Sequence, residues 1–153
     1  MTYPFEVNLQ NRKACYYFLK TLSLEQLNKI PAGFSNNIFW NIAHTVATQQ
    51  GLIYGLSGLP TLVDGDFIAK YRKGTRPEAN ATEKDVEELK KLVFLTVEAT
   101  EKDFNNGRFK EFKRYKLSSI KSELNSVEDA IHFNNFHEGL HLGYIMALNK
   151  AIK

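Results

Sequence analysis

The sequence has a single cysteine, four prolines and no long uninterrupted apolar segment. Cys15 has no partner for an internal disulfide, and its place in an aromatic, helical run predicts a buried core side chain. No segment approaches the roughly 20 apolar residues of a membrane span, so we expect no membrane interaction. The N-terminus lacks a basic region followed by an apolar run, and we therefore expect a cytoplasmic protein.

A large excess of one charge is also missing, because 20 basic and 17 acidic side chains give a net charge of +3. The excess is local: residues 108–121 carry six Lys or Arg side chains and one Glu. Phe109, Phe112 and Tyr115 interrupt this basic stretch with the spacing of an anchored connector. No recognised nucleic-acid module surrounds it, so we expect no nucleic-acid partner.

Length and composition are those of an ordinary globular protein. The chain has 153 residues, of which 43% are hydrophobic and 24% charged. That length allows one substantial core without disulfide support. We predict a single domain over residues 1–153.

Helical periodicity dominates the sequence, and almost no alternating strand pattern is present. Motifs typical of a capping box begin at Ser23, Thr82 and Ser126 and predict helix starts. Ser35 or Asn36 is predicted to cap a further helix. Long helices are predicted over residues 5–22, 36–56, 83–104 and 127–151. The sequence therefore predicts an all-α four-helix bundle with long crossover connections.

The connection at residues 57–80 is broken by glycine and proline and is too long for a hairpin turn, so we expect it to cross the molecule. Connections of this length are often functional. This one carries Tyr71 and Arg72, which are predicted to close a cleft and hold an anionic group. The alternative is a packed crossover loop with aromatic anchors.

The motif His137-Glu-Gly-Leu-His141 is the most informative part of the sequence, because two histidines four residues apart stack on one face of a helix. The same letters satisfy the H-E-x-x-H pattern of zinc peptidases. The sequence argues against that class, because residues 142–153 contain no His, Asp, Glu or Cys. The extended peptidase pattern would also need a glycine at Tyr144 and a histidine at Ala147. If a metal ion is bound, its third protein ligand must therefore come from upstream.

His44 is the upstream histidine that fits. It lies in a strongly apolar predicted helix, where a buried imidazole needs a hydrogen-bond partner or a metal ion. By three- and four-residue spacing it shares a polar helix side with Trp40 and Asn41. Three neutral imidazoles around one divalent ion, with positions left open for water or substrate, are typical of a catalytic rather than a structural site.

The helical wheel separates the other polar residues near the motif. At about 100° per residue, His137 and His141 lie about 40° apart, and Asn134 shares their stripe. His132 lies on another side of the helix and cannot join them, so we expect it to be on the surface or satisfied by a hydrogen bond. Glu138 is displaced by about 100° from His137. It either lines the pocket as a proton acceptor or faces a neighbouring helix or solvent.

Two motifs together, Trp40-Asn-Ile-Ala-His44 and His137-Glu-Gly-Leu-His141-Leu-Gly, carry a family resemblance. The chain resembles the DinB-like superfamily of small helical-bundle proteins over essentially its full length. The resemblance implies a bundle, often a homodimer, with one divalent metal ion held by His44, His137 and His141. One departure is visible: many relatives have a glutamine beyond the His-x-Gly turn, and this chain has Tyr144 directly after Gly143.

Relatives with assigned chemistry are similar to thiol-dependent transferases or isomerases. The resemblance therefore favours a metal-dependent S-transferase acting on a small-molecule electrophile, with zinc or nickel as the ion. A low-molecular-weight thiol such as bacillithiol, mycothiol or glutathione would be the co-substrate. The candidate catalytic residues are Glu138 and Asn134, and the candidate substrate-binding residues are Trp40, Asn41, Tyr71 and Arg72.

Two other functions stay open at this point. A hydrolase would use the same ion with Glu138 as the base. A non-catalytic bundle would serve as a stress-related metal-binding protein or scaffold, since ligands alone do not establish catalysis. The three hypotheses differ in whether a thiol is required and whether a metal ion is bound.

Overall fold

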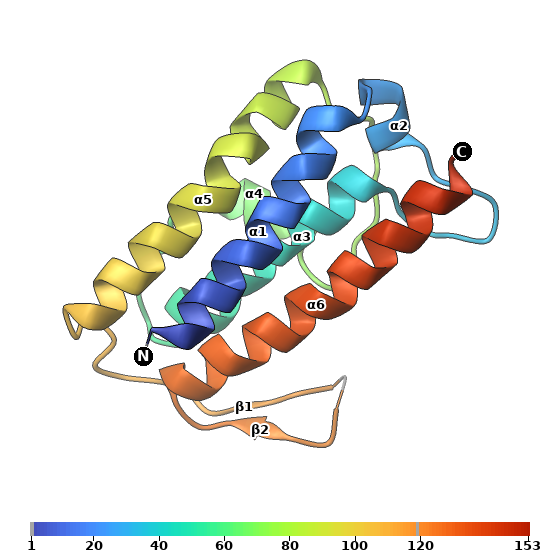
Figure 1. The fold of residues 1–153 in the computed structure, drawn as a ribbon. Helices are drawn as coiled ribbons and strands as arrows, with labels where there is room; N and C mark the ends of the chain where they lie inside the picture. Colours follow the sequence, from blue (N-terminus) through green and yellow to red (C-terminus); the bar gives the residue numbers. More distant parts are fainter. Residues whose placement is uncertain (1, 119) are drawn as a thin grey trace.

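The computed structural model describes residues 2–118 and 120–153. Its long helices are α1 (Tyr3–Thr21), α3 (Ile38–Gln50), α5 (Glu83–Asn105) and α6 (Val127–Ala151). In Figure 1, α1 and α6 run in one direction and α3 and α5 in the other. Both α1 and α3 pack against α5 and α6. The all-α bundle predicted from the sequence is confirmed, and the chain must cross the molecule between the parallel helices α3 and α5.

Local capping explains where several helices begin. Ser23 and Gln26 form a complete capping box at α2 (Leu24–Asn28), and Thr82 and Asp85 form another at α5. At α6, the Ser126 side chain accepts a hydrogen bond from the Asp129 backbone N–H. The Asp129 carboxylate, however, accepts from the backbone of residue 125, so only half of the third predicted box is present.

The start of α3 differs from the prediction by one or two residues. Asn37 is the N-cap, and its side-chain oxygen accepts from the Trp40 N–H at 2.8 Å. Asn36 instead accepts a hydrogen bond from the Asn41 side chain at 2.7 Å. The prediction of Ser35 or Asn36 as the cap was therefore wrong, because Asn36 is engaged by a side chain one turn into the helix.

The connection between α3 and α5 contains more regular structure than the sequence predicted. First α3 continues as a π-helical turn, η1 (Gly51–Gly55), which extends it to the predicted end. A short helix, α4 (Gly65–Tyr71), then lies within the crossover and is capped by Asp64, which accepts from the Phe67 N–H at 2.6 Å. The α4 helix packs against α3, and the Tyr71 carbonyl at its end lies within hydrogen-bond distance of His44.

The basic stretch at residues 108–121 leads into a small hairpin before α6. Strand β1 (Tyr115–Lys116) pairs with antiparallel strand β2 (Glu123–Leu124). An ion pair between Arg114 and Glu123, with an N–O distance of 3.0 Å, supports the pairing. The Lys113 N–H donates to the Leu56 carbonyl at 2.7 Å and so fixes the base of the hairpin to the end of η1.

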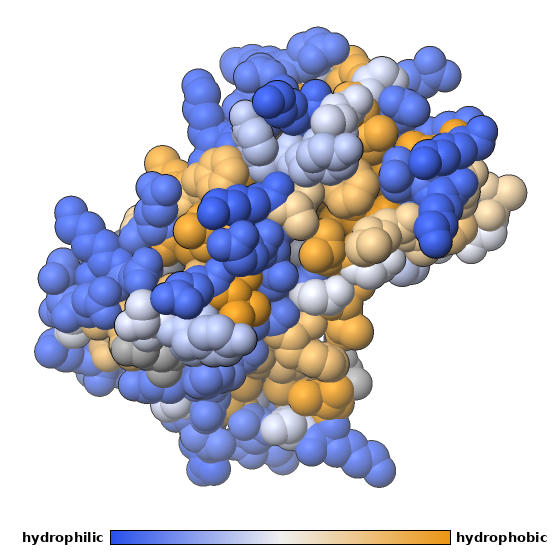
Figure 2. Space-filling model, viewed as in Figure 1, coloured by the Kyte–Doolittle hydropathy of each residue, from blue (hydrophilic) through white to orange (hydrophobic). Residues whose placement is uncertain are grey.

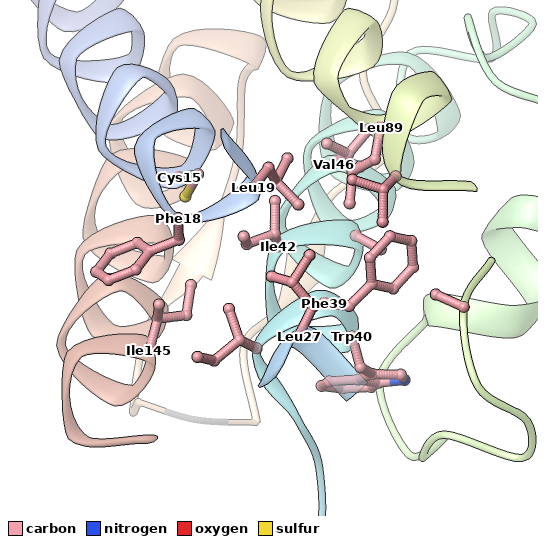
Figure 3. Packing of buried hydrophobic residues seen from close by; sticks show 14 of the residues in the cluster. Cys15, Phe18, Leu19, Leu27, Phe39, Trp40, Ile42, Val46, Leu89 and Ile145 are labelled. Atoms are coloured by element: carbon pink, nitrogen blue, oxygen red, sulfur yellow. The ribbon is translucent and has the colours of Figure 1, made fainter. Parts of the chain in front are cut away.

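Apolar side chains from all four long helices meet inside the bundle (Figure 3). One cluster lies around Leu19, Ile42 and Leu89, and a second surrounds Phe5 and Tyr54 at the opposite end. Cys15 is 2% exposed within the first cluster, as predicted. Burial raises the pKa of its thiol to about 12, so this thiol stays protonated at neutral pH.

Among the described residues, none of the helices combines the length and apolar character that crossing a membrane requires.

Candidate metal centre

Three histidines from two helices meet at one point of the bundle. The ring centroids of His44 and His141 are 4.7 Å apart, and those of His137 and His141 are 4.5 Å apart. One nitrogen from each of the three rings can be chosen so that all lie within 4.8 Å of one another. The helical spacing therefore brings the pair on α6 against the single histidine on α3, and the group could hold a metal ion.

The ring of His44 is oriented by the crossover. Its Nδ1 lies 2.6 Å from the Tyr71 carbonyl oxygen, at the end of α4. Since a carbonyl only accepts, the proton is on Nδ1 and Nε2 carries the lone pair. The Thr48 hydroxyl lies 3.3 Å from that Nε2. The Trp40 ring stacks on one face of the His44 ring, with the two ring centroids 4.7 Å apart and the ring planes at 10° to each other.

The ring of His141 is oriented by Asn41. The Asn41 amide nitrogen donates to the Asn36 side chain and to the Asn37 carbonyl, each at 2.7 Å. These two bonds fix the amide so that its oxygen faces the His141 Nδ1 at 2.8 Å. His141 therefore donates from Nδ1 and keeps its lone pair on Nε2. Hydrogen bonds of this kind orient metal-binding histidines and set their tautomer.

His137 differs from its two neighbours. Its Nδ1 is buried and has no hydrogen-bond partner among residues 2–118 and 120–153. A buried nitrogen without a partner is costly in a folded protein. A divalent cation bound by the three rings would be consistent with this arrangement, because the His137 ring packs against the other two. The donor set, all imidazole, fits zinc, nickel and other divalent transition metals.

The electrostatics of the group favour neutral rings. Burial lowers the pKa of His137 to about 3, and repulsion from His141 and His44 in their protonated forms adds to this effect. Burial and the charge of His44 lower the pKa of His141 to about 4. Burial also lowers the pKa of His44, against an opposing effect of its bond to the Tyr71 carbonyl. Neutral imidazoles are the form that binds metal, so the site is ready for an ion at neutral pH.

The three histidines lie at one side of a cleft of about 310 Å³. Its other walls come from α3, η1, the first half of α6, the loop after α4 and the β1–β2 hairpin. Most of these residues are apolar or aromatic. They are Leu52, Tyr115, Leu117, Phe133 and Leu140, together with the polar Thr48, Lys73 and Ser118. A small molecule can therefore reach the histidines from solvent.

The predicted substrate-binding residues do not line this cleft. Trp40 and Asn41 are buried behind the histidines, where they orient His44 and His141. The Tyr71 side chain packs against Phe67 of α4, and its carbonyl oxygen lies 2.6 Å from the His44 Nδ1. Arg72 is exposed. The crossover therefore contributes to the site through a backbone carbonyl and Lys73.

Glu138 lies away from the cleft, in a buried ion pair with Arg12 of α1. The Arg12 Nε lies 3.0 Å from both carboxylate oxygens of Glu138, and Nη2 lies 2.7 Å from Oε1. Asn134 donates to the same carboxylate at 2.8 Å. Arg12 also donates to Thr96 on α5 and Gln49 on α3. These contacts place Glu138 and Asn134 in a polar layer that joins all four long helices. His132 is exposed, as the helical wheel predicted.

Sequence reasoning missed two residues that matter here. Arg12 occupies the buried stripe of α1, in line with Phe5, Asn8, Cys15 and Leu19, so its spacing alone was a signal of burial. Lys73 had no such signal, because it lies in an irregular loop whose path depends on tertiary contacts.

The sequence model of the DinB superfamily matches residues 9–145 of the chain. The matched region begins within α1, includes the crossover and the hairpin, and contains all three clustered histidines. Among curated proteins, none matches the chain.

Proposed function

The chain belongs to the DinB superfamily, and we propose that it is a metal-dependent S-transferase that joins a low-molecular-weight thiol to a small electrophile. The observation that carries the proposal is a cluster of three histidines with depressed pKa values at the side of an open cleft. A purely structural metal site is usually closed by four protein ligands. Three protein ligands beside an accessible cleft leave room for a reactant.

His44, His137 and His141 would hold the ion, which in the proposal is zinc or nickel. A divalent ion at such a site supplies Lewis acidity, which lowers the pKa of a thiol or water that it contacts. The protein supplies the orientation: Tyr71 through its carbonyl and Asn41 through its amide oxygen direct the rings. Leu52, Phe133 and the other apolar walls limit the water around a bound reactant.

In the proposed reaction, the thiol sulfur attacks an electrophilic carbon of the second substrate. A C–S bond forms, the bond from that carbon to its leaving group breaks, and the leaving group departs with the electron pair. The thiol proton passes to solvent at the open end of the cleft. Glu138 is not assigned as the proton acceptor, because both of its carboxylate oxygens accept from Arg12.

The engagement of Glu138 also bears on the hydrolase alternative. A hydrolase of the H-E-x-x-H type needs a glutamate that can accept a proton from water beside the ion. Here that carboxylate is 2% exposed and lies within the bundle. The transferase is favoured because it does not require this base.

The first test is elemental analysis of protein purified without a metal-binding tag, after incubation with single divalent ions. We expect about one equivalent of ion in the wild type, and little in His44→Ala or His141→Ala. His132→Ala is the matched control, because it removes an exposed imidazole from the same helix as His141 and should leave the metal content unchanged. Unchanged metal content in His44→Ala would disprove the site between α3 and α6.

The second test separates the transferase from the alternatives. Metal-loaded protein is incubated with an aryl halide electrophile and with bacillithiol, mycothiol or glutathione in turn. Product formation that needs both a thiol and His44 supports the proposal. Turnover of ester or amide substrates without any thiol would favour the hydrolase. A stoichiometric metal with neither activity would favour the metal-binding or scaffold function.

A homodimer is also part of the proposal. Figure 2 shows apolar residues exposed among charged ones on one face of the molecule. On α1, Tyr3 and Tyr17 are 73% and 62% exposed, which supports a partner surface there. Light scattering would report twice the chain mass of 17.5 kDa for a dimer. A Tyr17→Lys variant that remained dimeric would exclude this face of α1.

A further inference from the structure

The cleft beside the histidines has an unbalanced charge. Lys73 is the one lysine among its lining residues, and within the described chain no Asp or Glu lines it. An imidazole ring is either neutral or positively charged, so the three histidines cannot offset the lysine. A divalent ion held by them would add further positive charge. We therefore expect the molecule that binds in this cleft to carry the negative charge that balances Lys73.

The acidic residue that follows His137 in sequence is already engaged elsewhere. Glu138 follows a clustered histidine in sequence, but it is paired with Arg12 inside the bundle at 2.7 Å. The side chain of Lys73 also has no salt bridge with any acidic group in the part of the chain that the structure describes. Lys73 instead donates to the Ser118 hydroxyl of the hairpin, which is a neutral and exposed partner.

That hydrogen bond places the ammonium group at the border of the cleft. Lys73 lies in the loop after α4, and Ser118 lies in the loop after β1, so the contact joins the two segments that border the cleft opposite the bundle. An anionic group that reached Lys73 could accept a charge-assisted hydrogen bond, which is stronger than a bond to a neutral hydroxyl. The lysine therefore does not need to move far from its present position to bind an anion.

The rest of the cleft is suited to an apolar group. Leu52, Leu117, Phe133 and Leu140 line it, and Leu140 is 55% exposed, so that apolar surface continues to the mouth. A ligand with an apolar body would cover this surface, and burial of apolar area would contribute to its binding.

We propose that Lys73 is an anion-binding, specificity-determining residue, and that the small molecule bound in the cleft carries an apolar body and a carboxylate or similar anionic group. The proposal rests on the proposed function in taking this cleft as the place where the substrates bind. It adds the chemical class of ligand, which neither the three histidines nor the family supplies.

The test uses two probes of nearly equal size, 3-phenylpropionate and the neutral 3-phenylpropionamide, titrated into metal-free protein and followed by NMR. Metal-free protein is used so that the carboxylate cannot bind an ion instead of Lys73. We expect the wild type to bind the acid about fivefold more tightly than the amide, the size of one partly exposed ion pair. Lys73→Met should remove that preference and leave the affinity for the amide unchanged.

Lys116→Met is the matched control. Lys116 lies between Tyr115 and Leu117, which both line the cleft, but alternation along the strand turns it to the other side. This variant removes a charge of the same kind from the hairpin that Lys73 contacts, and it should keep the preference for the acid. A preference retained in Lys73→Met, equal affinities in the wild type, or no saturable binding of either probe would overturn the proposal.

The metal content of the same preparations is measured after loading with zinc and, separately, with nickel. A Lys73-dependent preference in protein that binds neither ion would support the anion site and refute the proposed S-transferase. One equivalent of either ion without a Lys73-dependent preference would refute the anion site alone.

Discussion

At the centre of the bundle, Arg12 is completely buried and forms its ion pair with a carboxylate that is almost as inaccessible. Removing one member of such a pair leaves an uncompensated buried charge, whereas replacing both by apolar groups is often tolerated. We therefore expect Arg12→Met to lower the free energy of unfolding by about 3–5 kcal/mol. The double variant Arg12→Met/Glu138→Leu should recover most of that loss. Urea denaturation at neutral pH measures both.

Lys90→Met is the control for the buried pair. It removes the ion pair between Lys90 and Glu87, in which the glutamate side chain is 63% exposed. An exposed pair of this kind contributes little, so the change should stay within about 0.5 kcal/mol. If Arg12→Met were no more destabilising than Lys90→Met, the polar layer would not be important for stability.

Asn41 acts on the candidate metal site through His141, whose Nδ1 donates to its amide oxygen. Loss of such a supporting hydrogen bond typically weakens metal binding by about 10- to 100-fold. We expect Asn41→Ala to show a loss of that size in a competition titration against a chelator. Asn149→Ala, which alters a half-buried asparagine further along α6, should bind the metal as the wild type does. Equal affinities of the two variants would contradict a positioning role for Asn41.

At the element scale, the start of α5 is stabilised by a complete capping box between Thr82 and Asp85. The Asp85 carboxylate accepts hydrogen bonds from the Thr82 backbone and hydroxyl, each at 2.7 Å, and these bonds lower its pKa below the ordinary value of 3.8. A depressed pKa in the folded state means that the carboxylate stabilises the protein above its unfolded-state pKa. That contribution is lost as pH falls through the folded-state pKa.

We therefore expect Asp85→Asn to be less stable than the wild type at pH 7 by about 0.5 kcal/mol, the size of a charge effect in the first helical turn. The difference should shrink below pH 4 and vanish once the wild-type carboxyl group is protonated. Denaturation curves at pH 7 and at lower pH measure it. Glu98→Gln, an exposed change in the middle of the same helix, should show no comparable pH dependence. A difference that persisted at low pH would rule out the charge as its cause.

The elements that the sequence predicted well are those that local interactions determine. Thr82 and Asp85 lie three residues apart, and so does the capping pair at Ser23, so the sequence alone identified both starts. The cap of α3 was predicted one or two residues too early, because adjacent asparagines were both able to act and a side-chain hydrogen bond from Asn41 engages Asn36. The hairpin was not predicted, since its strands have two residues each and its base depends on a bond to Leu56.

The same distinction applies to the candidate site. His137 and His141 are brought together by helical spacing, and His44 by its place in an apolar helix, so these three residues were accessible to sequence reasoning. The direction of Glu138 was not, because it depends on Arg12, which is 126 residues away along the chain. Lys73 enters the cleft only through the path of the crossover.

At the scale of the whole molecule, the apolar side chains form two clusters that three helices share. The α1 helix contributes Leu19 to one and Phe5 to the other, and α6 contributes Ile145 and Ile131 in the same way. The α5 helix reaches the second cluster through Phe104. The polar layer of Arg12 lies between them without interrupting any helix. Separating the clusters would break these helices, so the two ends are expected to unfold together.

This continuity gives the single-domain prediction a direct test. Trp40 is the only tryptophan, and it belongs to the first cluster, so its fluorescence reports one end of the bundle. Far-UV circular dichroism reports all helices at once. We expect the two signals to give the same urea midpoint, with a slope of about 2 kcal/mol per molar. A fluorescence transition that came clearly before or after the loss of helix would show that the ends unfold independently and that the chain is not one cooperative domain.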